Sequence, residues 1–344
     1  MASRRVNRRS IANLPAGLPT TAPPAEFRSH ELELPAAAAG LRFDQALARA
    51  LPQYSRAQLK TWIESGAARA EGRPLRGKDR VLGGERVRIH AQLANVTEVV
   101  AEKLPLTVVF RDRALLVIDK PAGMVVHPGA GNPRHTLQNA LLGLDPKLAL
   151  VPRAGLVHRL DKDTSGLLVV ARTPEAHTAL VAALAAREIT RQYLAVCTGV
   201  MTAGGTIDEP IGRHRSQRTR MAVRRDGRPA VTHYRVLERF RAHTLVRAEL
   251  ESGRTHQIRV HLAHIGFPVV GDPLYGGRRR IPAGCTPALA AALGAFHRQA
   301  LHAERLALTH PLTGRRMEWQ APLPADLQSL LASLGQDAAS AALR

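Results

Sequence analysis

An irregular succession of helix-like and strand-like segments constrains the fold more than any other feature of this sequence. Apolar residues recur at helical spacing in 136–144, 175–186 and 255–265. Apolar runs typical of strands occupy 106–110, 114–118, 167–171, 191–197, 230–237 and 244–250. The two kinds of segment do not alternate regularly, and no glycine-rich nucleotide loop joins a strand to a helix. The pattern therefore predicts an α+β fold with a mixed, largely antiparallel sheet rather than a doubly wound fold.

A smaller α/β unit is predicted ahead of this region, over residues 41–90. Helical spacing in 41–50 and a capping-box pattern at Ser55 and Gln58 indicate two helices, and Gly66 ends the second. Short alternating segments then continue to residue 89. The unit resembles the S4 RNA-binding module, which implies that Arg56 and Lys60, on one helix face, contact RNA. An accessory packing domain is the alternative.

Composition sets apart the segments outside these two regions. Four arginines in the first nine residues, followed by prolines up to residue 24, predict a disordered basic tail over 1–30. Residues 91–104 lack a clear period and are predicted to be a linker. The larger domain then spans 105–325. The Ala-, Leu- and Ser-rich residues 326–344 are assigned to a C-terminal tail, with a terminal helix and a frayed end.

The net charge indicates a polyanionic partner. The chain has 344 residues, with 49 Lys and Arg against 28 Asp and Glu, a net charge of +21. Codon usage in a GC-rich genome can account for the preference for arginine over lysine but not for the positive sign. A field of this sign attracts polyanions, of which nucleic acid is the commonest in the cytoplasm. Because only 3% of the residues are aromatic, we expect a charged groove rather than a repeated base-stacking platform.

Residues 213–241 concentrate this charge, with ten arginines against two acids. Such a segment is either a solubilising surface or a strip that binds RNA phosphates, which supply position and most of the affinity in RNA contacts. The candidate phosphate contacts are Arg213, Arg215, Arg218 and Arg220.

Other features bear on location and assembly. No apolar run approaches the ~20 residues that a membrane span needs, and no apolar export signal follows the basic start. The two cysteines, Cys197 and Cys285, do not make a disulfide framework or a metal cluster by themselves. We therefore expect a cytoplasmic protein with no membrane contact. Because neither heptads nor an extended apolar surface pattern is visible, we also expect a monomer.

A polar segment at 155–166 holds the candidate chemistry. Asp161 lies between the cations Arg159 and Lys162, which would keep a partly buried carboxylate ionised and able to act as a nucleophile or base. A turn that satisfies its own backbone groups is the alternative. The string His158-Arg-Leu-Asp161 is similar to the catalytic loop of protein kinases, but the other sequence motifs of that family are missing. The histidines of segment 255–265 lack the i, i+4 spacing of a helical zinc site, so no metal is predicted.

Three blocks, in their order along the chain, resemble the RluA family of RNA pseudouridine synthases. They are His158-Arg-Leu-Asp-Lys-Asp-Thr-Ser-Gly166, Arg191-Gln-Tyr193, and Gly253-Arg-Thr-His-Gln-Ile-Arg259, which continues to Gly271-Asp-Pro-Leu-Tyr-Gly276. The first and third are long, nearly uninterrupted strings. The resemblance covers about residues 41 to 325 and implies the pseudouridine synthase fold for the larger domain.

The resemblance also implies a reaction and its catalytic residues. Members of the family detach uracil from ribose and rejoin it through C5 without a cofactor, a metal or an energy source. By motif position, Asp161 is the essential carboxylate, which either attacks the sugar or removes a ribose proton. Arg259 would pair with Asp161, and Tyr193 would stack on the uracil and accept or relay the C5 proton.

The substrate-binding residues implied in the same way are Arg159, Ile258, Arg254 and His256. Arg159 would fill the space left by a flipped nucleotide or hold its phosphate, because an enzyme that reworks a base must extract it from its stack. Ile258 would pack below the base.

Further stretches point to one branch of the family. Residues 125–132, 201–206 and 229–234 look most like the D-type branch, which acts on uridines in the helix 69 stem-loop of large-subunit rRNA. The expected partner is therefore 23S rRNA or a precursor of the large ribosomal subunit. The alternatives are the C-type branch, which modifies other 23S rRNA uridines, and a non-catalytic rRNA-binding or ribosome-assembly protein.

Overall fold

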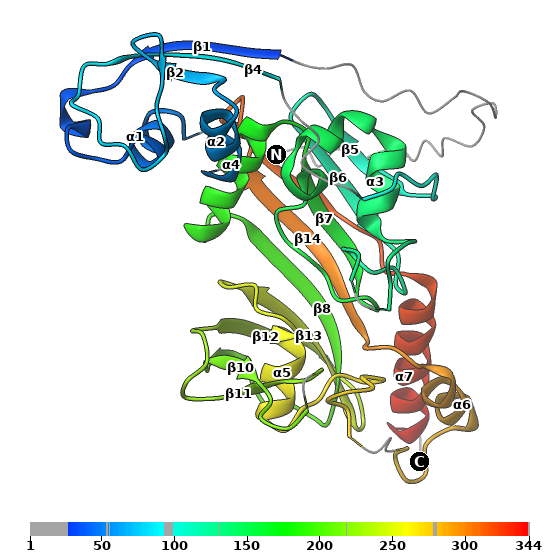
Figure 1. Cartoon of the computed structure of the whole chain (residues 1–344). Helices are drawn as coiled ribbons and strands as arrows, with labels where there is room; N and C mark the ends of the chain where they lie inside the picture. Colours follow the sequence, from blue (N-terminus) through cyan, green and yellow to red (C-terminus); the bar gives the residue numbers. More distant parts are fainter. Residues whose placement is uncertain are drawn as a thin grey trace.

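A small sheet and two helices form the N-terminal unit of this computed structural model, which describes residues 27–342 except 53, 55, 93–98, 130, 218 and 278–280. The strands lie in the order β1-β4-β2-β3. Their bounds are Phe27–Glu33 for β1, Ala68–Ala70 for β2, Arg73–Pro74 for β3 and Arg86–Gln92 for β4, and the helices are α1 (Phe43–Ala50) and α2 (Arg56–Glu64). The unit has its own apolar core, which Leu150 of the larger domain joins, and lies at the upper left of Figure 1.

This unit begins earlier in the sequence than predicted. Strand β1 pairs with β4 along its whole length, from Phe27↔Gln92 to Glu33↔Arg86, and Leu34 directly after it is only 1% exposed. The predicted tail over 1–30 therefore ends by residue 26, and residues 1–26 lie outside the described part. The strand escaped detection because its residues alternate between exposed and half-buried, so that it carries little apolar signal. The predicted linker 91–104 likewise loses residues 91–92 to β4, and 93–98 are not described.

The larger domain is built on a nine-stranded sheet with the order β5-β6-β7-β14-β8-β13-β12-β9, and β15 pairs with β14. Among the described strands of this sheet, β7 and β14 are the one parallel pair. The predicted mixed, largely antiparallel sheet is thus confirmed. The strands are β5 (Thr107–Arg111), β6 (Leu115–Lys120), β7 (Ser165–Ala171), β8 (Thr190–Thr198), β9 (Gly205–Asp208), β12 (Val231–Arg239), β13 (His243–Leu250), β14 (Leu301–Thr309) and β15 (Arg316–Gln320).

Helices cover both faces of this sheet. They are α3 (Leu137–Leu144), α4 (Pro174–Ala185), α5 (Gln257–His264), α6 (Pro287–Ala295) and α7 (Ala325–Ala342), with short 3-10 turns at Pro146–Leu150 and Pro152–Gly155. Strand β7 is buried along its whole length. Leu168 and Val170 face a core shared with α3, α5, α6 and α7, and Leu167 and Val169 face a second core shared with α4. Because each such side chain contributes ~1.5–3 kcal/mol on burial, both layers stabilise the central strands.

The C-terminal helix belongs to the larger domain. The predicted terminal helix is confirmed as α7, but the boundary that assigned 326–344 to a tail is wrong, because Leu327, Leu330 and Leu334 lie in the main core. Asp337 is 3% exposed and accepts hydrogen bonds from Arg241 Nε and from the backbone N–H of Thr286. Figure 1 shows α7 packed beside α6. Within the described residues, no helix combines the length and apolarity needed to cross a membrane.

Two short strands form a separate hairpin near the larger sheet. Strand β10 (Ile211–Arg213) pairs with β11 (Met221–Val223) in an antiparallel manner. Val260 of α5 packs in a small apolar cluster with Ile211, and Met221 and Val223 pack against this cluster. The hairpin therefore rests on the helix that carries Arg259.

Candidate active site

A cavity of about 380 Å³ opens where the loop before β7, strand β8 and the start of α5 meet. Every residue predicted to act in catalysis or substrate binding lines it: Arg159, Asp161, Tyr193, Arg254, His256, Ile258 and Arg259. The fold therefore brings together three sequence blocks that span about a hundred residues. The volume lies in the range of small-molecule sites in proteins, which are mostly ~300–1,000 Å³.

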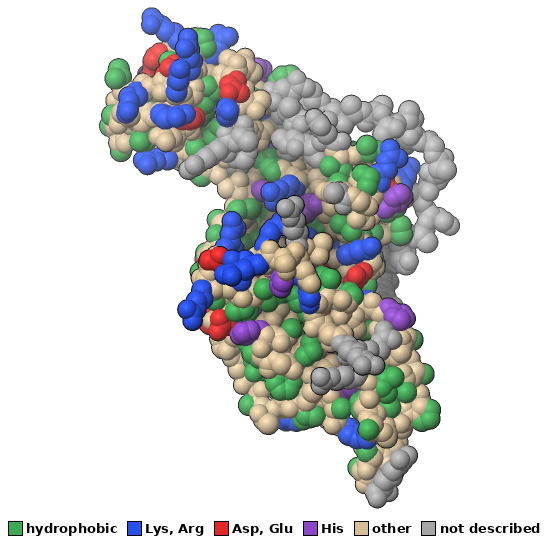
Figure 2. Space-filling model, turned by 60° about the horizontal axis from the view of Figure 1, so that its bottom comes forward, with side chains coloured by type: hydrophobic (Ala, Val, Ile, Leu, Met, Phe, Trp, Pro, Cys, Tyr) green, Lys and Arg blue, Asp and Glu red, His purple; other side chains and the backbone are tan. Residues whose placement is uncertain are grey.

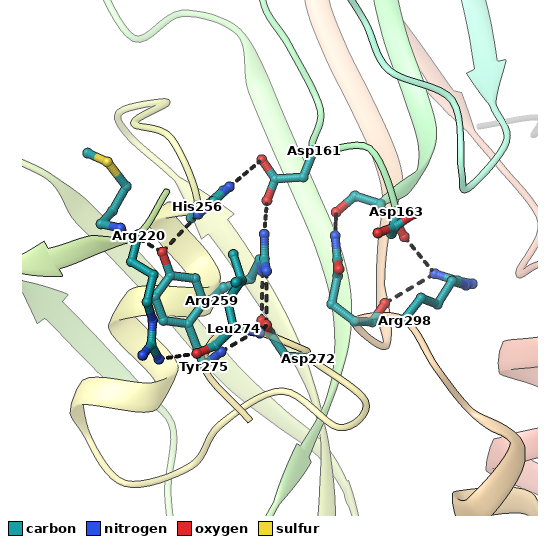
Figure 3. Close-up of polar contacts among 12 residues, drawn as sticks. Asp161, Asp163, Arg220, His256, Arg259, Asp272, Leu274, Tyr275 and Arg298 are labelled. Atoms are coloured by element: carbon teal, nitrogen blue, oxygen red, sulfur yellow. Dashed lines mark hydrogen bonds and ion pairs between the residues drawn. The ribbon is translucent and has the colours of Figure 1, made fainter. Parts of the chain in front are cut away.

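A chain of two carboxylates and one guanidinium forms the floor of this site. Arg259 Nη1 donates to Asp161 Oδ2 at 2.8 Å, so the structure contains the ion pair that the resemblance implies. Arg259 Nε and Nη2 donate to the two oxygens of Asp272 at 2.7 and 2.9 Å, in a bidentate pair. Arg259 is 3% exposed and Asp272 5% exposed. Figure 3 shows Arg259 between the two carboxylates.

Electrostatics keep Arg259 and Asp272 ionised. Burial opposes the charge on Arg259, but hydrogen bonds and ion pairs with Asp272 and Asp161 outweigh it and raise the guanidinium pKa. Burial likewise opposes the charge on Asp272, but the bonds from Arg259 and two backbone amides hold its carboxyl pKa below the ordinary value. Arg259 is therefore a permanently charged group that can orient Asp161.

Local backbone contacts position these side chains. Asp272 Oδ1 accepts the backbone N–H groups of Leu274 and Tyr275 at 2.9 and 3.0 Å, in a tight turn after α5. On the other side, the backbone of β7 comes so close to β14 that a Cβ at Gly166 would lie 2.2 Å from the carbonyl oxygen of Ala303. The glycine, with φ +113°, permits this approach directly after the loop of Asp161.

A buried lysine ties the loop of Asp161 to the end of β6. Lys120 is fully buried, and its Nζ donates to the carbonyl oxygens of Pro121, Met124 and Lys162 at 2.8, 2.9 and 3.0 Å. Burial lowers the pKa of Lys120 to about 7, partly offset by the carboxylates of Asp163 and Asp161. Because Lys162 directly follows Asp161, this contact fixes the backbone that carries the carboxylate.

His256 faces the carboxylate oxygen of Asp161 that Arg259 does not contact. It precedes α5 in the left-handed backbone region, with φ 58°. Its Nε2 lies 3.9 Å from Asp161 Oδ1, and its Nδ1 lies 2.8 Å from the hydroxyl of Tyr275. Burial lowers the pKa of His256 in spite of the neighbouring carboxylate. The ring is therefore neutral at neutral pH.

Tyr193 and Ile258 supply the apolar walls. Tyr193 lies on β8 opposite Ala248 of β13 and Ala303 of β14, and it is 5% exposed. Burial raises the pKa of its hydroxyl, which therefore stays protonated at neutral pH. Ile258, on α5, is 4% exposed. An apolar ring and an aliphatic side chain thus meet in one cavity with a charged carboxylate.

The two remaining cations sit differently in the cavity wall. Arg159 is exposed, two residues before Asp161. Arg254 is partly buried, and its Nε donates to the carbonyl oxygen of Pro229 at 3.1 Å. Arg159 is therefore the more accessible of the two to a ligand.

Of the residues predicted to bind RNA, the described side chains of Lys60, Arg213, Arg215 and Arg220 do not line this cavity. Arg213 and Arg215 are exposed, at the end of β10 and in the loop after it. Arg220 is partly buried, donating to Gln217 and to the carbonyl oxygen of Leu274. Lys60 is exposed beside Glu64, with Nζ 3.6 Å from its carboxylate. Arg218 lies outside the described residues, and Arg56 is the first residue of α2.

The structure adds three residues to the network that sequence reasoning did not assign: Lys120, Asp272 and Tyr275. Asp272 and Tyr275 belong to the string 271–276, but their contacts with Arg259 and His256 arise only from the turn after α5. The sequence held a partial signal for Lys120. This lysine closely follows the apolar run 114–118, and if the run is a buried strand, the ammonium group must find hydrogen-bond partners.

Comparisons with known proteins identify relatives over nearly the whole chain. The family model for RNA pseudouridylate synthase matches residues 114–264. A ribosomal large subunit pseudouridine synthase D from Xanthomonas campestris pv. campestris is 55% identical over 93% of this chain and 96% of the relative. Proteins of the same name from Pseudomonas aeruginosa and Escherichia coli strain K12 are 55% and 54% identical, over 89% and 87% of this chain and 95% and 92% of their own lengths.

Solved structures of RNA pseudouridylate synthase domains also align with this chain. Human RNA Pseudouridylate Synthase Domain Containing 4 aligns with a TM-score of 0.53 and 28% identity, over 66% of this chain and 92% of that one. Human RNA Pseudouridylate Synthase Domain Containing 1 aligns with a TM-score of 0.52 and 28% identity, over 68% and 89%. Asp161, Tyr193 and Arg259 all fall within the residues that the family model matches. The chain therefore belongs to the RluA family of RNA pseudouridine synthases.

Proposed function

We propose that this protein isomerises specific uridines of 23S rRNA to pseudouridine, with the helix 69 stem-loop as its target. The observation that carries the proposal is the Asp161 carboxylate, held at 2.8 Å by Arg259 in a cavity of nucleotide size. The names of relatives that are 54–55% identical support large-subunit rRNA as the substrate. The resemblance to the D-type branch supports helix 69.

The reaction needs one bond broken and one formed at the same sugar carbon. The N1–C1′ bond of uridine breaks, the C5–C1′ bond forms, and the proton that leaves C5 is balanced by one gained at N1. Asp161 acts on the ribose, either by attack on the sugar or by removal of a ribose proton. Arg259 orients Asp161, because its guanidinium donates to Asp161 and is itself anchored by Asp272.

The side chains of the cavity walls bind the uracil base. Tyr193 stacks on the uracil, and its protonated hydroxyl is suited to relay the C5 proton rather than to act as a phenolate base. Ile258 packs below the base. Arg159, exposed at the cavity, fills the space left by the flipped nucleotide or holds its phosphate. Arg254 and His256 complete the substrate contacts.

The wider surface binds the rRNA backbone. We assign this role to the exposed residues Arg213 and Arg215, to Arg218 and Arg220 of the same sequence segment, and to Arg56 and Lys60 of the N-terminal unit, taken as an S4-like domain. On the face shown in Figure 2, Lys and Arg side chains gather on the N-terminal unit and across the middle of the molecule. The protein acts as a cytoplasmic monomer on rRNA or a large-subunit precursor.

Mapping of pseudouridines in the rRNA of a deletion strain tests the proposal. We expect the helix 69 pseudouridines to disappear and to return when the wild-type chain is supplied. If they persist while other large-subunit sites are lost, the C-type assignment is correct. If Asp161→Ala restores them as well as the wild type does, the chain is not the catalyst, and an RNA-binding or assembly role replaces the proposed one.

A further inference from the structure

A tyrosine behind His256 connects the β10–β11 hairpin to the carboxylate of Asp161. The hydroxyl of Tyr275 lies 2.8 Å from the backbone N of Met221 in β11 and 2.8 Å from Nδ1 of His256. The opposite nitrogen of the same imidazole, Nε2, faces Asp161 Oδ1 at 3.9 Å. Figure 3 shows the three side chains in this order, Tyr275, His256 and Asp161.

The hydrogens in this row have one consistent arrangement. A backbone N–H is always a donor, so the Tyr275 oxygen accepts from Met221. If His256 Nδ1 carried a hydrogen, the oxygen would receive two donors, and its own hydrogen would find no acceptor among the described residues. Tyr275 is partly buried, a setting in which polar hydrogens are usually paired, and His256 Nδ1 is an acceptor within reach of its hydroxyl. Tyr275 therefore donates to Nδ1, and the hydrogen of the neutral imidazole sits on Nε2, the nitrogen that faces Asp161.

The ring of Tyr275 is itself held in place. The guanidinium groups of Arg259 and Arg220 lie 5.1 and 5.3 Å from its centroid, in cation–π contact. Its backbone N–H donates to Asp272, the anchor of Arg259. The hydroxyl therefore cannot turn away from His256 without breaking contacts on two sides.

We infer that Tyr275 is a positioning residue, which holds His256 in the tautomer whose Nε2–H is directed at Asp161 Oδ1. The inference rests on the proposed function and adds a second residue that holds the carboxylate of Asp161. Arg259 holds Oδ2, and His256 holds Oδ1 once substrate draws the carboxylate about 1 Å closer, from 3.9 Å to hydrogen-bond length. Contacts of this kind are often long without substrate and tighten in the complex.

The other tautomer of His256, with its hydrogen on Nδ1, would act against the reaction. It would direct the lone pair of Nε2 toward a negatively charged oxygen, and the two would repel each other. Asp161 would then be held through one oxygen and could rotate about its side-chain bond. Because the hydroxyl of Tyr275 is itself anchored to β11, the hairpin that carries the proposed phosphate-binding arginines also sets the orientation of the carboxylate.

Tyr275→Phe tests the inference, because it removes the hydroxyl and keeps the ring. We expect single-turnover isomerisation of an rRNA fragment to slow by about tenfold, the size of one lost hydrogen bond in the transition state, while the Kd for the fragment changes less than twofold. The matched control is Tyr54→Phe, which removes a Tyr–His contact of the same 2.8 Å length in the N-terminal unit. It should leave the rate unchanged.

A double variant separates positioning from a loss of packing. The amide of His256→Gln can donate toward Asp161 without help from Tyr275. Adding Tyr275→Phe to His256→Gln should therefore slow the reaction less than twofold further. Wild-type rate in Tyr275→Phe, or a tenfold further loss in the double variant, would overturn the inference.

A spectroscopic readout is independent of turnover. Nitrogen-15 NMR of histidine-labelled protein distinguishes the two imidazole tautomers, and the His256 signals are identified by their loss in His256→Gln. We expect Nε2–H in the wild type and a shift toward Nδ1–H in Tyr275→Phe. A wild-type ring with Nδ1–H contradicts the inference whatever the activity. A wild type that shows Nε2–H but does not isomerise rRNA would contradict the proposed function alone.

Discussion

The cavity floor and the β10–β11 hairpin both contain arginines, but the arginines differ in burial and in their contacts. Arg259 is 3% exposed and donates three hydrogen bonds to two carboxylates. Arg213 and Arg215 are exposed on the hairpin and its loop. The same side chain is thus a fixed part of the site in one region and an accessible cation in the other.

The difference has an energetic consequence. Burying an ion costs several kcal/mol, so removing one partner of a buried pair is expensive. Exposed cations contribute little to stability, but they supply salt-dependent affinity for phosphates. The cavity floor should therefore respond to substitution through stability and turnover, and the hairpin through RNA affinity. The following predictions test this division, beginning with the largest effect.

Asp161→Asn should reduce turnover by at least about a thousandfold, because it removes the charge proposed to act on the ribose. Stability should fall by only about 1 kcal/mol, since Arg259 keeps its bidentate pair with Asp272. Single-turnover assays and urea unfolding measure the two effects. Asp163→Asn, in the same turn, is the control and should keep its activity. Turnover within tenfold of wild type in Asp161→Asn would remove the catalytic role of this carboxylate.

Asp272→Asn should lower the free energy of unfolding by about 3–5 kcal/mol, because it leaves Arg259 buried with one counter-ion instead of two. The matched control is Asp226→Asn. Asp226 also binds an arginine, Arg224, through both oxygens, but at an exposed position. Its replacement should change urea unfolding far less. If the two substitutions lowered the free energy of unfolding equally, burial would not explain the difference between the cavity floor and the hairpin.

Acid should destabilise the cavity wall through His158. Its Nε2 accepts the backbone N–H of Val169 at 3.1 Å, and burial, with the charge of Arg191, lowers its pKa to about 3. The unfolded chain takes up this proton near pH 6.5 and the folded chain does not, so stability falls as the pH drops below 6.5.

Between pH 7.5 and 5.0 this single group should cost about 2 kcal/mol. His158→Gln should show a correspondingly smaller loss in urea unfolding at the two pH values. His264→Gln, at an exposed position of α5, should keep the wild-type pH dependence. If His158→Gln also keeps it, the imidazole is not the buried neutral group described above.

Arg215→Ala should produce the smallest change, and only in RNA binding. We expect the Kd to rise a few-fold and the slope of log affinity against log salt to fall by about 0.7–0.9 for one lost phosphate contact. The free energy of unfolding and the rate at saturating RNA should stay at wild-type values. Arg316→Ala, an exposed arginine on β15, is the control and should leave the slope unchanged. A fall in the saturated rate would place Arg215 with the catalytic groups.

Periodicity and motif strings were sufficient for much of this molecule. The succession of helical and strand-like segments predicted α3, α4, α5 and the strands β5 and β6, because local spacing of apolar residues reflects which face is buried. The motif strings by themselves pointed to Asp161, Tyr193 and Arg259, and all three line one cavity. In both cases the relevant information lies within a few neighbouring residues.

Other features depended on contacts between distant segments. Strand β1 became visible only through its pairing with β4, and α7 joined the main core through three leucines that a short tail would expose. Periodicity and motifs thus determined the fold class, the reaction family and the central carboxylate. Only the tertiary structure decided how that carboxylate is held, because Asp272 and Tyr275 reach Arg259 and His256 through a turn that closes after α5. Hydrogen bonds between side chains depend on three-dimensional geometry, which no local spacing in the sequence records.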